Sequence, residues 1–211
     1  MKYKKLKFLG RGFEFCVYQY DKNRVIKTPT SPIQIFRKLL VWEPKLLLSP
    51  KKLFWRLSQI KQMRWKSIEV IKRSNIDKKY FGNFKHHKDY IIQDRGEILK
   101  YYLNQDKNSS KKYIKKYINL LFKLWEYGIS DNVFNITINN IVNKNGEVIF
   151  CDLGEILTEK EKVKELIKKK KWLKQYSYRF HMNRETKQIF KEEMDRYITI
   201  ENLEKYWRSR V

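Results

Sequence analysis

The sequence has few cysteines, few prolines and few acidic residues, and it has no long apolar run. Its two cysteines, Cys16 and Cys151, have apolar neighbours in segments typical of strands, which favours buried, reduced thiols and a cytoplasmic protein. No group of Cys and His residues has the spacing of a zinc site. No run approaches the roughly 20 apolar residues of a membrane span. No apolar segment follows the basic residues 1–5, so no signal peptide is expected.

The shortage of acidic residues leaves a large positive net charge. Among 211 residues, 48 are Lys or Arg and 23 are Asp or Glu, which gives a formal net charge of +25. Hydrophobic residues still make up 42% of the chain, enough for a folded protein with a buried core. The positive potential favours nucleic acid, an anionic membrane surface or a phosphorylated substrate as the partner, and charge alone does not choose among them.

Residues 128–155 contain the clearest pattern in the sequence. Two short apolar strands flank Asn145 and Gly146, a pair typical of a hairpin turn. Asn140 enters the first strand and Asp152 follows the second, so the hairpin brings an amide and a carboxylate close together. Such a pair of oxygen ligands suits a magnesium ion that also binds nucleotide phosphates. The alternative is an ordinary hairpin with an Asp at its end.

A second pattern lies near the start of the chain, over residues 6–28. A strand, a turn with Gly10 and Gly12, a second strand, a polar turn and a third strand are expected there. The third strand contains Lys27. A glycine turn alone equally fits a plain hairpin, but a glycine turn, a strand lysine, and then the Asn and Asp of the later hairpin form an order that chance rarely produces.

In this order, residues 6–155 resemble the catalytic core of the protein-kinase-like superfamily. The resemblance implies that the glycine turn lies over the phosphates of ATP, that Lys27 contacts the α- and β-phosphates, and that Asn140 and Asp152 bind Mg²⁺. It also implies that the backbone after the fifth strand binds the adenine. The positions that correspond to the family's nucleotide-binding residues are Gly10, Arg11, Gly12, Phe13, Val17, Lys27, Gln93, Asp94 and Arg95.

Two positions depart from the family pattern. The third glycine of the turn is Phe15, and the catalytic Asp, five residues before Asn140, is replaced by Asn135. The general base is then absent, unless the loop is shifted and Asp131 takes its role. Because phosphoryl transfer depends mostly on positioning and charge neutralisation, an enzyme that uses Asn135 is expected to be slow rather than inactive.

The family also pairs its strand lysine with a carboxylate on a helix. Between Lys27 and Asp77 the sequence offers two acidic residues, Glu43 and Glu69. Glu69 lies on the more regular helical pattern, so it is the preferred partner of Lys27, where an ion pair would fix the ammonium group over the phosphates.

Residues 29–76 are expected to form a helical insertion, which the four prolines of the chain divide into short pieces. Lys and Arg residues alternate there with Trp42, Trp55 and Trp65. That pattern can dock on an anionic membrane or stack on single-stranded nucleic acid. The preferred interpretation is structural, with the tryptophans packed inward and the lysines in solvent.

The expected fold is α+β and two-lobed, of the protein-kinase-like kind. An N-lobe with an antiparallel sheet is expected over residues 1–95, and a reduced helical C-lobe with the catalytic-loop hairpin over residues 96–211. The small C-lobe resembles atypical bacterial members of the superfamily, namely the kinases of lipopolysaccharide core sugars and the PhoP-regulatory-network kinase-like proteins.

The resemblance implies an atypical kinase that requires ATP and Mg²⁺ and phosphorylates a hydroxyl group. The acceptor would be an anionic glycan, a lipid-linked sugar or a protein Ser/Thr, in the cytoplasm or at the inner face of the membrane. The alternative is a pseudokinase, a regulatory module that binds nucleotide or a partner without catalysis. A third hypothesis is a basic nucleic-acid-binding protein that uses the lysine run at residues 168–171.

Overall fold

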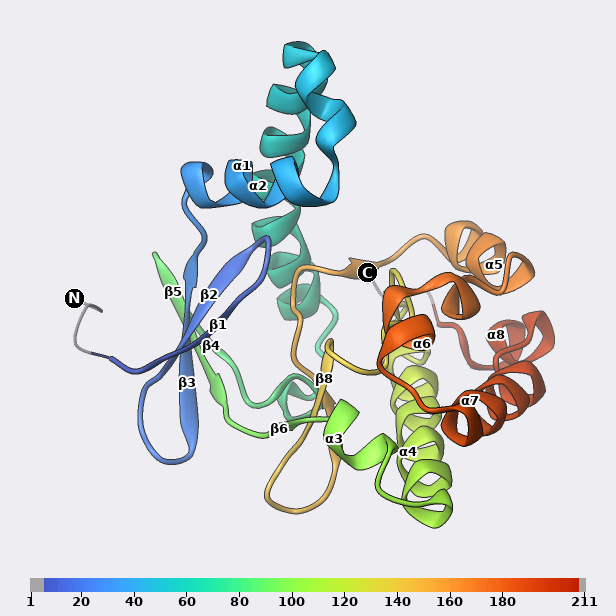
Figure 1. Ribbon diagram of the computed structural model, residues 1–211. Coiled ribbons are helices and arrows are strands. Elements are labelled where there is room, and N and C mark those ends of the chain that lie inside the picture. Colours follow the sequence, from blue (N-terminus) through green and yellow to red (C-terminus); the bar gives the residue numbers. More distant parts are fainter. Residues whose placement is uncertain (1–5, 209–211) are drawn as a thin grey trace.

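The computed structural model describes residues 6–208, apart from the side chains of Trp42 and Leu47. The predictions for the basic residues 1–5 and for Trp42 lie outside the described residues. The chain is α+β, as expected, with a five-stranded antiparallel sheet on one side and a group of helices on the other (Figure 1). Within residues 6–208, no helix is both long enough and apolar enough to cross a lipid bilayer.

The sheet has the strand order β1-β2-β3-β5-β4, and β3 lies at its centre. Its strands are β1 (Phe8–Arg11), β2 (Phe15–Gln19), β3 (Arg24–Pro29), β4 (Lys85–His87) and β5 (Tyr90–Asp94). The strands expected on either side of the glycine turn are confirmed. In β3, Val25 and Ile26 are buried together with Lys27, so the central strand places a charged side chain inside the protein.

Three helical segments lie between β3 and β4, and the part of them at the top of Figure 1 projects away from the sheet. They are α1 (Pro32–Trp42), η2 (Pro44–Leu48) and α2 (Pro50–Arg73). Each begins with a proline in its first turn, where the missing amide breaks no helical hydrogen bond. The Ser31 hydroxyl caps α1 by accepting a hydrogen bond from the Gln34 amide. The expected helical insertion is therefore present.

Short strands connect the sheet to the helical part of the chain. A three-stranded sheet has the order β6-β8-β9, and β10 pairs with β7. These strands are β6 (Glu97–Ile98), β7 (Ser130–Asp131), β8 (Asn140–Val142), β9 (Val148–Phe150) and β10 (Ile156–Leu157). The expected hairpin turn is confirmed between β8 and β9, where Gly146 has φ +74°, a conformation that glycine adopts easily.

The long helix α4 (Lys107–Trp125) forms the centre of the main hydrophobic core. Asp106 caps its first turn by accepting from the Ser109 amide at 2.9 Å, and the inward face buries Tyr117, Leu121 and Trp125. The helix packs against β9, α7 and α8. The remaining helical segments are η3 (Lys78–Phe81), α3 (Lys100–Leu103), α5 (Lys160–Lys168), η4 (Lys171–Lys174), α6 (Tyr176–Phe180), α7 (Arg184–Tyr197) and α8 (Ile200–Tyr206).

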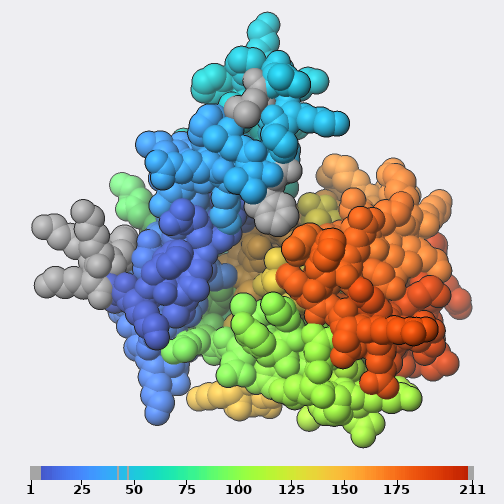
Figure 2. All heavy atoms as spheres, in the orientation of Figure 1, coloured from blue at the N-terminus to red at the C-terminus, as the bar shows by residue number. Residues whose placement is uncertain are grey.

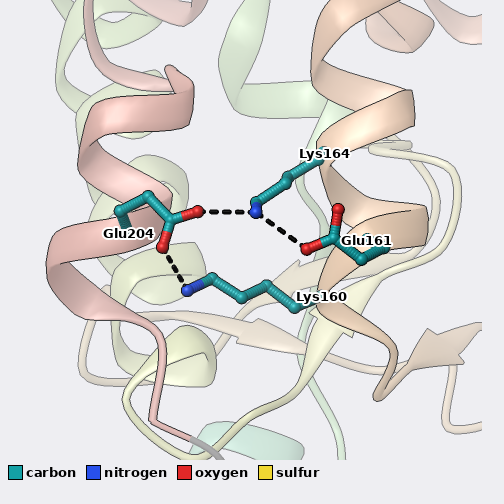
Figure 3. Close-up of polar contacts among 4 residues, drawn as sticks. All are labelled: Lys160, Glu161, Lys164 and Glu204. Atoms are coloured by element: carbon teal, nitrogen blue, oxygen red, sulfur yellow. Dashed lines mark hydrogen bonds and ion pairs between the residues drawn. The ribbon is translucent and has the colours of Figure 1, made fainter.

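A surface network of ion pairs joins α5 to α8 (Figure 3). The Lys164 ammonium group lies 2.7 Å from both Glu161 and Glu204, and Lys160 also pairs with Glu204. Exposed ion pairs of this kind contribute at most about 1 kcal/mol each. The buried apolar residues, rather than these charges, therefore hold the helical part together.

Candidate functional site

A cavity of about 710 Å³ lies between the five-stranded sheet and the β8–β9 hairpin. Its lining comes from the glycine turn between β1 and β2, from β3, from the segment that links β5 to α3, and from both ends of the hairpin. The volume is within the range of ordinary small-molecule sites. This cavity is therefore the candidate functional site.

Lys27 supplies a buried ammonium group to the cavity. The residue is only 8% exposed, and its Nζ donates a 2.5 Å hydrogen bond to the carbonyl oxygen of Cys151. Cys151 directly precedes Asp152, which lines the same cavity. Lys27 and Asp152 therefore face one shared space, although they are far apart in the sequence.

The glycine turn forms the roof of the cavity through Gly10, Arg11 and Gly12. Side chains from outside the turn hold its backbone, because Lys38 donates to the Arg11 carbonyl at 2.6 Å and Thr30 donates to the Gly12 carbonyl at 3.3 Å. A Cβ atom built on Gly10 would meet no heavy atom within 4 Å, so there is open space at this point of the turn. The backbone of the roof is therefore held by side chains outside the turn, and there is free space beside Gly10.

One predicted residue of the glycine turn does not reach the cavity. Phe13 packs instead against the small core between α1 and α2, and Lys38 lies over its ring with Nζ 5.3 Å from the ring centre. The prediction that Phe13 contacts the cofactor is therefore not supported. Val17, the next predicted residue along β2, does line the cavity.

Glu14 also lines the cavity, and the sequence reasoning missed it. A Cβ atom built on Gly154 would lie 1.3 Å from the Glu14 carboxylate, so this side chain extends from the turn onto the backbone that follows Asp152. Its Oε2 is buried and has no hydrogen-bond partner among the described residues. The sequence does show a carboxylate between Gly12 and the second strand. Its contacts with the backbone after Asp152, however, come from a distant part of the chain and could not be predicted from local pattern.

The environment of Glu14 favours the protonated carboxyl group. Burial raises its pKa to about 9, and the nearby carboxylates of Asp152 and Glu155 act in the same direction. The Arg64 guanidinium group and the Lys27 ammonium group oppose this shift. The roof of the cavity therefore presents a neutral acid at neutral pH.

The floor of the cavity is formed by Asn139 and Asp152, not by Asn140 and Asp152. Asn140 is fully buried, and its amide group donates to the carbonyl oxygens of Asn135 and Ile136, at 3.2 Å each. Neighbouring residues at the start of a strand point to opposite sides, so one of the two asparagines faces the cavity and the other faces the protein interior. Asn140, which the sequence analysis predicts as a metal ligand, therefore does not line the cavity, and Asn139 lies there in its place.

Neither predicted catalytic-loop residue lines the cavity. Asn135 accepts a hydrogen bond from Thr137 through Oδ1, within its own loop. Asp131 is completely buried, and it accepts from the Tyr117 hydroxyl at 3.2 Å and from the Val133 amide at 2.8 Å. Burial raises the pKa of Asp131 to about 7. These contacts give Asp131 a structural role, and the structure does not bring it or Asn135 to Lys27.

The predicted carboxylate partner of Lys27 is also wrong. Glu69 lies on the exposed side of α2 and pairs with Lys72 at 2.8 Å, while Glu43 pairs with Arg56 at 3.3 Å. The buried charged residue of α2 is instead Arg64, whose guanidinium group lies 5.4 Å from the centre of the Phe15 ring. The helix is rotated so that a cation, rather than a carboxylate, faces the sheet.

Gln93, Asp94 and Arg95 line one end of the cavity, as the sequence predicts. The Asp94 amide donates to Gly82 and the Arg95 amide to Asn23, so these two donors are already used within the protein. The chain then crosses to β6 at Gly96, where a Cβ would lie 2.4 Å from the Val142 carbonyl oxygen. Only glycine permits this close crossing. The walls here are apolar and include Leu9, Val17, Val25, Ile98 and Ile141.

The floor has oxygen donors but no complete metal site. The Asn139 amide group donates to Glu155 at 2.6 Å, so the amide oxygen is the remaining atom of Asn139 that can bind a cation. Burial raises the pKa of Glu155 to about 8. The part of the chain that the structure describes contains no group of three or more His, Cys, Asp or Glu residues able to bind a metal. A cation at Asn139 and Asp152 would therefore need further ligands from a substrate, which phosphates provide.

Comparison with known proteins assigns the chain to no family. No family model matches the sequence, and no curated protein matches it. The function must therefore be inferred from the chemistry of the cavity rather than from relatives.

Proposed function

We propose that the cavity binds ATP with Mg²⁺ and that the protein transfers a phosphoryl group to a hydroxyl acceptor. The observation that carries the proposal is that Lys27, Asp152 and a glycine turn with open space at Gly10 line a single cavity. A lysine, a carboxylate and a backbone turn are the parts that position a triphosphate in phosphotransferases. A two-lobed protein-kinase-like fold, with the sheet on one side of the cavity and the helices on the other, is part of this proposal.

Each residue has a role in the proposed reaction. Lys27 exchanges its hydrogen bond to the neutral Cys151 carbonyl for bonds to phosphate oxygens, which carry negative charge. Asn139 and Asp152 provide the oxygen ligands for Mg²⁺, which when bound would neutralise the phosphate charge. The apolar end of the cavity, near Val25 and Ile141, accommodates a base. The net charge of +25 favours an anionic acceptor, such as a phosphorylated sugar or a lipid-linked sugar, with a protein Ser/Thr as the alternative.

A pseudokinase is the second candidate, and a specific observation favours it. Neither Asn135 nor Asp131 faces the cavity, so neither can accept a proton from a substrate there. General-base assistance contributes about 10²- to 10⁴-fold to a rate. Its absence fits either a slow phosphotransferase or a module that binds nucleotide without catalysis.

Thermal-shift titration tests nucleotide binding, which a phosphotransferase and a nucleotide-binding pseudokinase have in common. Mg-ATP should raise the melting temperature of the wild-type protein, because a ligand that binds the native state stabilises it. Asp152→Ala should weaken the effect of Mg²⁺ on ATP binding, whereas Asp89→Ala, at an exposed turn between β4 and β5, should leave it unchanged. A melting temperature that does not respond to Mg-ATP would refute nucleotide binding at this site.

Turnover of radiolabelled ATP separates the two candidates. A phosphotransferase should release labelled product slowly, and Asp152→Ala should abolish that release. A protein that binds Mg-ATP but shows the same background turnover as Asp152→Ala is a pseudokinase.

A further inference from the structure

The segment that projects farthest from the sheet exposes large apolar side chains. Among the described residues, the three most exposed large hydrophobic side chains are Leu48 (87%), Val41 (75%) and Phe54 (71%), and Trp55 is 63% exposed. We call residues 41–55 the basic tip. Figure 2 shows η2 and the start of α2 standing clear of the rest of the molecule at the top of the view.

The exposed apolar residues are not needed to pack the basic tip. Its inner side is already fixed by a small core in which Leu53 and Ile60 of α2 pack against Ile35 and Leu39 of α1. Phe54 and Trp55 follow Leu53 on the same helix, but their side chains are exposed, whereas Leu53 is buried in this core. Large exposed apolar groups gathered in one place mark a binding surface.

The charge around this apolar surface has one sign. Residues 41–62 contain five Lys or Arg residues and one acidic residue, Glu43, which pairs with Arg56. No ion pair within residues 6–208 involves Lys45, Lys51 or Lys52. The basic tip therefore combines exposed apolar groups with lysines whose charge is not balanced by a nearby carboxylate.

We infer that the basic tip docks on the surface of an anionic lipid membrane. Leu48, Phe54 and Trp55 enter the boundary between headgroups and acyl chains, while Lys45, Lys51 and Lys52 bind lipid phosphates. Trp, Phe and Leu beside Lys on a helix are typical of such interfacial segments, and each lysine adds electrostatic attraction to anionic lipid. The inference does not depend on the proposed chemistry of the cavity.

Other occupants fit this surface less well. Val41 and Leu48 have no aromatic face for a base to stack on, which disfavours single-stranded nucleic acid. Protein interfaces are depleted in lysine, whereas the exposed residues of the basic tip include Lys45, Lys51 and Lys52. An anionic bilayer accepts both kinds of side chain at once.

Vesicle co-sedimentation of the full chain tests the inference. The wild-type protein should bind phosphatidylcholine vesicles that contain phosphatidylglycerol and should not bind vesicles of phosphatidylcholine alone. Phe54→Ser with Trp55→Ser, and separately Lys51→Glu with Lys52→Glu, should each weaken binding by about tenfold or more. Circular dichroism melting of each variant establishes that it is folded.

Matched controls separate docking from general attraction to a basic protein. Phe180→Ser removes an aromatic side chain that is 67% exposed on α6, and Lys111→Glu with Lys115→Glu reverses two exposed lysines on α4. Both controls should bind within about twofold of the wild type, since a local contact depends on the residues that form it. Equal loss in the control and tip variants would overturn the inference. So would Trp55-dependent binding to an oligonucleotide, or Trp55-dependent dimerisation in sedimentation velocity, without vesicle binding.

Discussion

In the cavity, ionisable groups are shielded from water. At the basic tip, large apolar side chains are exposed to water. Lys27 is 8% exposed and the Glu14 Oε2 atom is buried beside Gly154, while Leu48 is 87% exposed. Each arrangement is opposite to the one that folding stability favours, because burying charge and exposing apolar surface both cost free energy. Folding stability therefore does not account for either region, and both are candidate binding sites. The cavity is a candidate site for a small anion, and the basic tip for an extended surface.

The two regions differ in how far the protein offsets that cost. In the cavity, Lys27 and Asn139 are bonded to the Cys151 carbonyl and the Glu155 carboxylate, whereas the Glu14 Oε2 atom has no hydrogen-bond partner among the described residues. At the basic tip, Phe54 and Trp55 leave most of their apolar surface in solvent. Substitutions in the cavity should therefore change stability as well as binding, and substitutions at the tip should change binding alone.

Lys27→Ala should have the largest effect on ligand binding. Removing the ammonium group deletes charge-assisted hydrogen bonds to phosphate, worth about 3 kcal/mol, or roughly 100-fold in affinity. Isothermal titration calorimetry with Mg-ATP measures this loss. Lys85→Ala, an exposed lysine on β4, is the matched control and should bind as the wild type does. Unchanged affinity in Lys27→Ala would show that the buried cation does not serve a phosphate ligand.

Gly154→Ala should destabilise the protein by about 1 kcal/mol, because the new methyl group overlaps the Glu14 carboxylate and this flexible side chain must turn away. In a Glu14→Ala background the same substitution should cost less, since the overlapping group is gone. Urea denaturation of the two single variants and the double variant measures the coupling. Strictly additive effects would show that Glu14 does not rest against Gly154.

Glu14→Gln should change the pH dependence of stability. Since the pKa of Glu14 is raised from 4.5 to about 9 on folding, the folded state retains a proton that the unfolded state loses. The free energy of unfolding that Glu14 contributes therefore falls as pH rises from about 4.5 towards 9. Because glutamine does not ionise, the Glu14→Gln variant lacks this decrease. The variant should match the wild type near pH 4.5 and exceed it by at least about 1 kcal/mol at pH 8.

The control for this experiment is Glu192→Gln, an exposed glutamate on α7. Denaturation curves across the pH range should be parallel for this variant and the wild type. If the Glu14→Gln curves are parallel to the wild type as well, Glu14 is ionised in the folded protein and the cavity roof is not neutral.

Local patterns predicted the elements around the cavity well. The Asn145-Gly146 turn predicted the β8–β9 hairpin, and the glycine turn with its flanking apolar residues predicted β1 to β3. Both predictions were possible because turn geometry and strand period depend only on neighbouring residues. Lys27 lies in β3 and Asp152 follows β9, and both residues line the cavity.

The errors come from choices that only tertiary packing decides. Asn139 and Asn140 are adjacent and identical in type, and the one that faces the cavity depends on backbone bonds from Cys151 and Asp152 to the Asn139 carbonyl. The rotation of α2, which buries Arg64 and leaves Glu69 in solvent, depends likewise on its contacts with the sheet. The preferred prediction that the tryptophans of residues 29–76 pack inward is wrong for Trp55, which is exposed. Exposed Leu48 and Phe54 have the same local pattern as core residues, so the sequence alone could not choose between inward packing and an exposed surface.

The smallest effect expected concerns the stability of the basic tip. Phe54→Ser with Trp55→Ser should change the free energy of unfolding by less than about 0.5 kcal/mol, because both side chains are mostly exposed to solvent. Leu53→Ala, at the neighbouring inward-facing position, should cost about 2 kcal/mol through lost burial in the small core between α1 and α2. Urea denaturation compares the two. A large loss in the serine variant would show that Phe54 and Trp55 are covered within the folded chain, and the contrast between cavity and tip would then disappear.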